Sequence, residues 1–380
     1  MSTTDALQPA PEEHARLIGK IPVRNLWLLM LYASDLFRQI GTAKIAVEDN
    51  PEEIADLVAE ILCHQVERRL MRNLSYGYQH KVAVIGRVRG RIDTLYTERH
   101  RLMDKGKVCC RFEELTVDTP RNRYVRAALE KLPLLVNNNN LGHRCRTLAL
   151  SLARIGVNND KPVGYSGNSE RFGRHDAEDQ KMVAAADLAF SLAVPTEFSG
   201  RHYLAMPDKN KAWLRKLFEK GIAGFYAVAL DKSEWRVQAG KQFNWQIEDR
   251  TGGIDSILPS MKTDIIIASK LTQNRLVIDT KFNSVTTQGW HREETLRSGY
   301  IYQMYTYLRS QEDDSDPTSF SASGMLLHPS VNREVNESVT IQGHSIRFCT
   351  VNLGNEAKII REQLLGLLSE SFKGEPHGYI

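Results

Sequence analysis

Two short β-type runs, each interrupted by an acidic residue, constrain the fold of this chain more than any other feature. The first run is TDIIIA, residues 263–268, and the second is RLVIDTK, residues 275–281. Branched aliphatic residues favour strands, and two such runs around a short polar turn predict an antiparallel hairpin. A turn centred on residues 271–272 places Asp264 opposite Asp279, with their Cβ atoms about 5 Å apart.

The paired carboxylates require a counter-charge if this hairpin is buried. Two like charges about 5 Å apart, at an effective dielectric near 20, repel by roughly 3 kcal/mol. A divalent cation such as Mg²⁺ or Mn²⁺ would offset this repulsion and leave positions for water and phosphate. Lys281 lies two residues beyond Asp279 and shares its face. It could orient a water that the metal activates.

We therefore predict a metal-dependent phosphodiester-cleaving site built on Asp264, Asp279 and Lys281. The alternative is a strand pair with a surface Asp–Lys–Asp salt bridge. Acidic residues are depleted in strands, and both carboxylates here interrupt apolar runs that look buried. These two facts favour the metal site over the salt bridge.

Three further residues are candidates for the same site. Gln303 and Tyr307 lie four apart in YIYQMYTYL, a predicted helix, so they share one helix face. They could hold a DNA backbone near the metal, or they could be ordinary packing residues. Glu219, in the predicted helix WLRKLFEKGIAGFY, could add a carboxylate to the metal site, or could be a solvated side chain paired with neighbouring lysines.

The length of 380 residues allows two or three domains. We expect a flexible lead over 1–20, an α+β N-terminal domain over 21–198, and an α/β C-terminal domain over 199–380. The order of helix, strands, helix and strand in the last domain predicts a mixed central sheet flanked by helices. Helices are expected at about 26–37, 51–72, 121–136, 143–155, 181–194, 210–230, 295–310 and 356–372, and strands at about 80–93, 234–246, 261–268, 275–282, 323–328 and 346–352.

Positive charge is concentrated in the first half of the chain. Between Gln65 and Arg126 there are 15 Lys and Arg against 7 Asp and Glu, although the whole chain has a net charge of only +4. In the predicted strand HKVAVIGRVRGRID, Arg87, Arg89 and Arg91 point to one face and the valines to the other, because side chains alternate. This arginine face could contact DNA or a protein partner, or could be a solvated surface.

The composition is that of a soluble globular protein, with 42% hydrophobic and 25% charged residues. The five cysteines contain no CxxC pair, so neither a zinc finger nor a disulfide framework is indicated, and a reducing cytoplasm is expected. The N-terminal segment is polar and acidic, unlike a signal peptide. The longest early apolar run, Leu26 to Ala33, is far shorter than the roughly 20 residues that span a bilayer, so we expect no membrane insertion.

These segments together resemble a known nuclease family. A D…DxK hairpin followed by a QxxxY helix is similar to the PD-(D/E)xK nuclease superfamily. The resemblance narrows to the McrC family, the nuclease subunits of McrBC modified-cytosine restriction systems, through the segments IPVRNLWLLMLYASDLF, GRVRGRID, FEELTVDTPRNRYVRAAL, SMKTDIII, LVIDTKF, YQMYTYL, GMLLHPSV and FCTVNLG. They run from about residue 21 to 372. One departure is Thr263, which stands where the superfamily usually has proline before the first aspartate.

The resemblance implies a fold, an activity and partners. The C-terminal domain would have the restriction-endonuclease-like α/β fold and would hydrolyse DNA with Mg²⁺. Asp264, Asp279 and Lys281 fall on the catalytic positions, and Gln303 and Tyr307 on the QxxxY helix. The N-terminal domain would insert into the pore of a McrB-type hexameric AAA+ GTPase and stimulate it. That partner would bind GTP and recognise double-stranded DNA containing modified cytosine.

Two other functions are compatible with parts of the sequence. No GxxxxGK[ST] phosphate-binding loop occurs, so a motor, if one is needed, must come from another chain. The first alternative is a stand-alone RecB-like or Cas4-like nuclease, although the four-cysteine spacing of Cas4 is absent. The second is a non-catalytic activator of a ring NTPase, and the intact Asp264, Asp279 and Lys281 argue against it.

Overall fold

A computed structural model describes residues 17–18, 21–34, 53–167, 170–173, 176–199, 208–272, 274–288, 294–330 and 334–372. Contacts divide the chain into two compact units. The sheet unit combines Met1–Ile54 with Val194–Ile380, and the arm unit is Ala55–Ala193. Each unit is described separately below.

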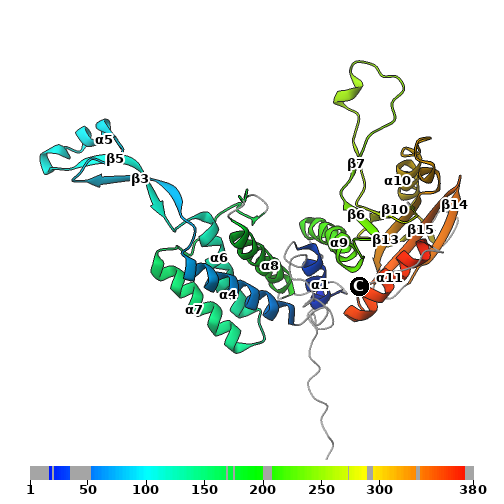
Figure 1. The fold of residues 1–380 in the computed structure, drawn as a ribbon, viewed down its shortest axis with the longest axis horizontal. Coiled ribbons are helices and arrows are strands. Elements are labelled where there is room, and N and C mark those ends of the chain that lie inside the picture. The colour runs from blue at the N-terminus through cyan, green and yellow to red at the C-terminus, as the bar shows by residue number, and fades with distance from the viewer. Residues whose placement is uncertain are drawn as a thin grey trace, which may run out of the picture. The chain divides into compact units, whose positions relative to one another are not determined.

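The sheet unit is built on a mixed sheet of six strands in the order β14-β15-β13-β10-β9-β6 (Figure 1). Its strands are β6 (Trp235–Ala239), β9 (Ile265–Ser269), β10 (Arg275–Thr280), β13 (Ser323–Ser330), β14 (Asn336–Ile341) and β15 (His344–Asn352). β10 is parallel to β13 and β13 to β15, whereas the other neighbouring pairs are antiparallel. The expected mixed sheet is confirmed. The sequence did not predict β14, whose side chains are mostly exposed.

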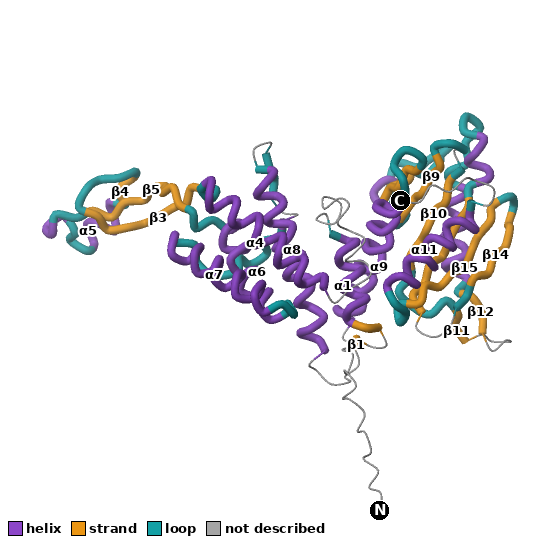
Figure 2. Tube along the Cα trace, turned by 60° about the horizontal axis from the view of Figure 1, so that its bottom comes forward, coloured by secondary structure: helices purple, strands orange, loops and turns teal. Residues whose placement is uncertain are grey.

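Helices cover both faces of this sheet (Figures 1 and 2). They are α9 (Asp208–Ala229), α10 (Ser298–Arg309) and α11 (Ala357–Ser371). α10 packs on the face that carries Ile266 and Val277. α11 lies on the opposite face, to which Arg347 of β15 points and where it pairs with Glu370. The Tyr226 hydroxyl of α9 donates a hydrogen bond to a backbone oxygen of α11 over 3.0 Å.

Helix α1 (Val23–Ala33) also belongs to the sheet unit, because it packs along α9. The approach is close: a Cβ at Gly224 of α9 would lie 1.8 Å from the carbonyl oxygen of Tyr32. Asn25 of α1 is buried, and its side-chain amide donates to the backbone oxygen of Leu353 over 2.7 Å. The expected domain over 21–198 therefore differs from the observed grouping, since its first helix joins the C-terminal half.

The arm unit combines helices with a three-stranded sheet in the order β3-β5-β4. Its elements are α4 (Ile54–Arg72), β3 (Gly77–Ile85), β4 (Arg91–Ile92), α5 (Thr94–Arg99), β5 (Val108–Thr116), α6 (Pro120–Lys131), α7 (Asn139–Ile155) and α8 (Ala177–Ser199). Arg121 of α6 links the helices through ion pairs with Glu170 and Asp179. The mixture of helices and strands agrees with the expected α+β class. α8 continues to Ser199, beyond the end that Pro195 predicted.

Short elements complete the described chain. They are β1 (Leu17–Ile18), β2 (Ile21–Pro22), β7 (Gln242–Phe243), β8 (Met261–Lys262), β11 (Thr286–Gln288), β12 (Glu294–Leu296) and the 3₁₀ turns Met103–Lys105, Leu132–Leu134, Ile254–Ser256 and Pro317–Ser321. All five cysteines are buried free thiols. Among the described helices, none combines the length and apolar character needed to cross a bilayer.

Candidate active site

The hairpin of β9 and β10 has the register that the sequence predicted. Ile265 pairs with Ile278, so the next positions outward are Asp264 and Asp279. Asp279 lies within β10 and also pairs with Leu326 of the parallel strand β13. Residues directly opposite each other in a sheet point to the same face. The two carboxylates therefore lie at one end of the hairpin and on one face of the sheet.

Asp264 is held in place by its neighbours. Its Oδ2 accepts hydrogen bonds from the backbone N–H and the hydroxyl of Thr280, both over 2.7 Å. Its backbone oxygen accepts from the N–H of Gly240 over 2.8 Å. Because these bonds use one carboxylate oxygen, they orient the group and leave Oδ1 to face a ligand.

Asp279 is a buried acid whose counter-charge is Lys281. It is 2% exposed, and its Oδ2 lies 2.6 Å from Lys281 Nζ but makes no well-formed hydrogen bond. Burial raises the pKa of Asp279 to about 6; the nearby Lys281 lowers it, while Asp264 and Glu219 raise it further. The ionised carboxylate is thus an unfavourable buried charge, which a bound cation would stabilise.

Glu219 of α9 also lies close to this site. Burial raises its pKa, and the charge of Asp264 raises it further, whereas Lys262, Lys220 and Lys216 lower it. The side chain is half-buried and senses the charges of Asp264 and of three lysines. Its part in a metal site stays a prediction.

Lys281 is positioned by a chain of hydrogen bonds from α10. Its Nζ donates to Gln303 Oε1 over 3.0 Å, and Gln303 Nε2 donates to the Tyr307 hydroxyl over 2.6 Å. The Tyr307 hydroxyl donates in turn to the backbone oxygen of Lys262 over 2.9 Å. An ammonium group only donates, so it sets the orientation of the Gln303 amide. Gln303 and Tyr307 share a face as predicted, but their polar groups hold Lys281 and β8 instead of being free for a DNA backbone.

An aromatic ring and a neutral histidine surround the same lysine. Lys281 Nζ lies 4.9 Å from the centre of the Tyr300 ring, a distance typical of a cation–π contact. The Tyr300 hydroxyl accepts a hydrogen bond from Asn283 Nδ2 over 2.5 Å. His328 Nδ1 lies 2.9 Å from the backbone oxygen of Asn283, and burial lowers the pKa of His328 to about 4. The imidazole is therefore neutral at physiological pH and adds no positive charge beside Lys281.

These neighbours were not identified from the sequence. Tyr300 precedes Gln303 by three residues, so helical spacing places it near the same face and offered a usable signal. Thr280 lies between Asp279 and Lys281, but its role comes from its hydrogen bonds to Asp264. Asn283 and His328 come from a loop and from β13, and no sequence spacing connects them.

The residues present fit a hard divalent cation. Among the described residues, no three His, Cys, Asp or Glu side chains converge as an all-protein metal cage. Mg²⁺ commonly binds through one or two carboxylates and takes its other ligands from water and phosphate. Asp264, with Oδ1 available, and Asp279, whose buried Oδ2 lacks a well-formed hydrogen bond, match that donor set. Glu219 would be an outer carboxylate.

The predicted arginine face lies in the arm unit, and the structure corrects it. β3 ends at Ile85, so Arg87 and Arg89 belong to a loop and Arg91 to β4. Gly90 turns the chain there with φ +67, and its Cβ position would lie 2.5 Å from a backbone oxygen of β5. The three arginines are exposed but do not share one strand face.

The valines of this segment are exposed too. Val82, Val84 and Val88, which we expected to share the apolar face of a strand, are 62%, 42% and 58% exposed. Arg89 pairs with Glu114 over 3.4 Å and lies over the ring of Phe112. The surface is therefore apolar as well as basic, a combination found where protein surfaces meet partners.

Two sequence comparisons find similarity to components of McrBC restriction systems. A sequence model of the family described as "McrBC 5-methylcytosine restriction system component" matches residues 7–317. A curated relative, the "Type IV methyl-directed restriction enzyme EcoKMcrBC" of Escherichia coli (strain K12), is 25% identical over 93% of this chain and 99% of its own length.

Two solved structures from Thermococcus gammatolerans share a more distant similarity. The first is a half-complex from a tetradecameric assembly of McrB AAA+ hexamers with bound McrC; it is 15% identical, with a TM-score of 0.40, over 91% of this chain and 76% of that chain. The second is a McrBC complex, 12% identical, with a TM-score of 0.30, over 50% of this chain and 61% of that chain. TM-scores at this level do not define a common fold.

Proposed function

Because the chain belongs to the McrBC 5-methylcytosine restriction system component family, we propose that it is the DNA-cleaving subunit of a restriction complex directed at modified cytosine. It would hydrolyse phosphodiester bonds of double-stranded DNA with Mg²⁺ or Mn²⁺. It would act in the cytoplasm with a McrB-type hexameric AAA+ GTPase, which binds the GTP and whose GTP hydrolysis this chain stimulates. The description of the E. coli relative as a methyl-directed restriction enzyme supports this choice.

One observation carries the proposal. Two carboxylates, Asp264 and Asp279, lie at the end of one hairpin, and Lys281 lies 2.6 Å from the second. A mixed sheet with helices on both faces surrounds them. We assign this unit to the PD-(D/E)xK nuclease class, since acid, acid and lysine occupy the positions that this chemistry requires.

Each side chain has a defined task in this proposal. Asp264 and Asp279 would hold the cation, with Glu219 supplying further negative charge. When bound, the cation would polarise the scissile phosphate and lower the pKa of an attacking water. The Lys281 ammonium, held between Asp279 and Gln303, orients that water and offsets the charge that develops on phosphorus.

Gln303 and Tyr307 act through Lys281. Their hydrogen-bond chain ends on the backbone of Lys262 in β8, so it connects the position of the lysine to the strand that leads into Asp264. The arm unit would engage the GTPase ring. Its exposed loop with Arg87, Arg89 and Arg91 would contact either that ring or DNA.

The test is reconstitution with the cognate GTPase. With Mg²⁺ alone, the isolated chain should cut a cytosine-methylated plasmid only weakly. Adding the GTPase and GTP should raise the cutting rate at least roughly 100-fold, which corresponds to about 2.7 kcal/mol of barrier. An unmethylated plasmid or a non-hydrolysable GTP analogue should give no increase.

Two results on agarose gels would support the alternatives instead. Strong cutting by the isolated chain without GTP would identify a stand-alone nuclease. Stimulation of GTP hydrolysis with no cutting under any metal condition would identify a non-catalytic activator.

A further inference from the structure

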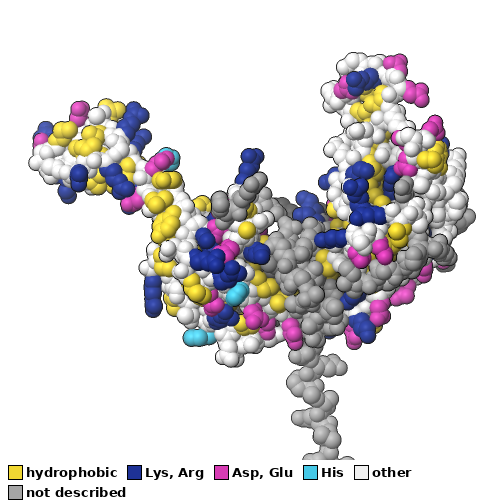
Figure 3. Space-filling model, viewed as in Figure 1, with side chains coloured by type: hydrophobic (Ala, Val, Ile, Leu, Met, Phe, Trp, Pro, Cys, Tyr) yellow, Lys and Arg dark blue, Asp and Glu magenta, His cyan; other side chains and the backbone are white. Residues whose placement is uncertain are grey.

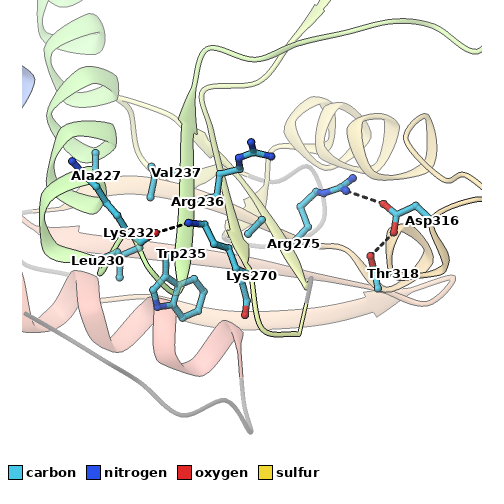
Figure 4. A pocket seen from close by; sticks show the side chains of 12 residues that line it. Ala227, Leu230, Lys232, Trp235, Arg236, Val237, Lys270, Arg275, Asp316 and Thr318 are labelled. Atoms are coloured by element: carbon cyan, nitrogen blue, oxygen red, sulfur yellow. Dashed lines mark hydrogen bonds and ion pairs between the residues drawn. The ribbon is translucent and has the colours of Figure 1, made fainter.

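A cavity of about 720 Å³ in the sheet unit is lined by positive side chains (Figure 4). Lys232, Arg236, Lys270 and Arg275 line it, and among the described lining residues Asp316 is the acidic one. The cavity wraps around β6, the edge strand of the sheet. None of these residues takes part in the candidate active site.

The sheet register brings two of the arginines onto one face. Arg236 of β6 and Arg275 of β10 both pair with Ala268 of the strand between them. The two arginines are two strand spacings apart, roughly 10 Å. Arg275 is compensated by Asp316 over 2.9 Å, whereas Arg236 has no carboxylate partner among the described residues.

A third cation extends the cluster. Lys241 follows β6, and its backbone oxygen accepts a hydrogen bond from the N–H of Thr263 over 3.0 Å, so it continues the edge strand toward Asp264. Burial lowers the pKa of Lys241, and the charges of Arg275 and Arg236 lower it further. Lys241 and Arg236 are exposed. Figure 3 shows Lys and Arg side chains gathered over the region of β6, below the segment that projects beyond β7. A polyanion would stabilise such a concentration of positive charge.

The cluster lies on the same sheet face as the paired carboxylates. Arg275 precedes Asp279 by four residues on β10, and an even spacing keeps both side chains on one face. At roughly 3.3 Å per residue the two positions are about 13 Å apart. Val277, which lies between these two positions, is buried under α10, so DNA that contacts the cluster would pass around α10 and not lie along this face.

We propose that Arg236, Lys241, Lys270 and Arg275 bind the phosphate backbone of duplex DNA beside the cutting site. This inference rests on the proposed nuclease function. Three of the four cations are exposed, so a polymer can pass across the site. A small ligand, in contrast, is usually enclosed over about 70–90% of its surface. Backbone contacts position DNA without reading its sequence, so target choice stays with the partner chain.

The test compares two variants that each remove one exposed positive charge. Arg236→Gln alters the cluster, and Lys358→Gln alters α11 on the opposite sheet face. Binding of a fluorescent duplex to the full-length chain is measured across a salt series, without divalent metal so that no cleavage occurs. Arg236→Gln should weaken binding about fivefold and reduce the slope of log K against log salt by about 1. Lys358→Gln should change neither quantity.

A charge-retaining variant distinguishes charge from folding. Arg236→Lys should restore most of the affinity, and Lys241→Gln should reproduce the weakening of Arg236→Gln. Equal affinity of Arg236→Gln and Lys358→Gln, in a protein that still cuts DNA with its partner, would overturn this inference and leave the proposed function intact. The inference would also be overturned if Arg236→Gln bound the duplex as tightly as wild type but no longer bound inorganic pyrophosphate. That result would identify a site for a small anion. No duplex binding by the wild-type chain, when the same protein cuts DNA with its partner, would overturn this inference and leave the proposed function intact.

Discussion

The substitution Asp279→Asn is expected to lower DNA cleavage by the reconstituted complex at least about 10³-fold, because losing a metal ligand removes roughly 4 kcal/mol of transition-state stabilisation. Stimulation of the partner's GTP hydrolysis should stay within about twofold of wild type. The reason is structural: Asp279 belongs to the sheet unit, whereas the arm unit is proposed to engage the ring. Plasmid cleavage and phosphate release, measured in the same reaction, check both expectations.

The same substitution should not destabilise the protein. Asp279 is buried, and its pKa is raised from 3.8 to about 6. The folded state therefore binds the proton more tightly than the unfolded state, and stability falls as pH rises from about 4 to about 6. Above that range the charge costs about 3 kcal/mol in the metal-free protein. A neutral asparagine removes this cost, so the melting temperature at pH 7.5 without metal should be unchanged or higher.

A matched control shows whether the effect is specific to this site or follows from the loss of any carboxylate. Asp255→Asn makes the same chemical change at an exposed position, where Asp255 pairs with Arg250. It should retain full cleavage. Cleavage by Asp279→Asn within about tenfold of wild type, a loss of under about 1.4 kcal/mol, would refute the site assignment. Loss of both cleavage and GTPase stimulation would instead place Asp279 in the coupling between the two chains.

The substitution Gly224→Ala is expected to destabilise the sheet unit by about 2–4 kcal/mol, since overpacking outweighs the gain in helix propensity. A Cβ at Gly224 would lie 1.8 Å from the backbone oxygen of Tyr32 and 2.6 Å from its carbonyl carbon. Backbone atoms cannot rotate away as a flexible side chain can. Helix α1 must therefore separate from α9, which exposes apolar residues of α1 such as Leu28 and Leu31. Thermal unfolding should show a fall of roughly 5–15 °C.

The control for this prediction is a substitution that should stabilise the protein. Gly366 lies in α11 with open space around its Cβ position, so Gly366→Ala should stabilise the protein by about 0.5–1 kcal/mol. Stabilisation by both substitutions would show that α1 does not pack on α9 as described. A fall for Gly224→Ala alone would confirm that packing.

The sequence correctly predicted those parts of the molecule that depend on the spacing of residues close together in the chain. A short turn connects β9 and β10, so the spacing of the residues alone predicted the register of this hairpin. The same register predicted that Asp264 and Asp279 lie opposite each other. The face shared by Gln303 and Tyr307 followed from the helical repeat in the same way. Such features depend on backbone geometry and not on distant contacts.

Other features depend on packing between distant segments. The apolar run of α1 predicted a buried helix but not its partner, α9, which lies nearly 200 positions along the chain. The arm strand was predicted too long, because valines and arginines alternate across Gly86 and Gly90, where the chain in fact turns. The hydrogen bonds of Gln303 and the surroundings of His328 involve several elements, so no local pattern could assign them.

Cleavage of the polypeptide by bound iron tests the central claim most directly. Fe²⁺ can replace Mn²⁺ at such a site, since a given N/O site generally binds Fe²⁺ more tightly than Mn²⁺, and with ascorbate and peroxide it cuts the backbone next to the place where it binds. Wild-type protein should give fragments ending near residues 264 and 279. Excess Mg²⁺ should suppress these fragments, and Asp264→Asn combined with Asp279→Asn should abolish them. Fragments that persist unchanged in the double variant, or that arise only elsewhere in the chain, would contradict a divalent cation held by Asp264 and Asp279.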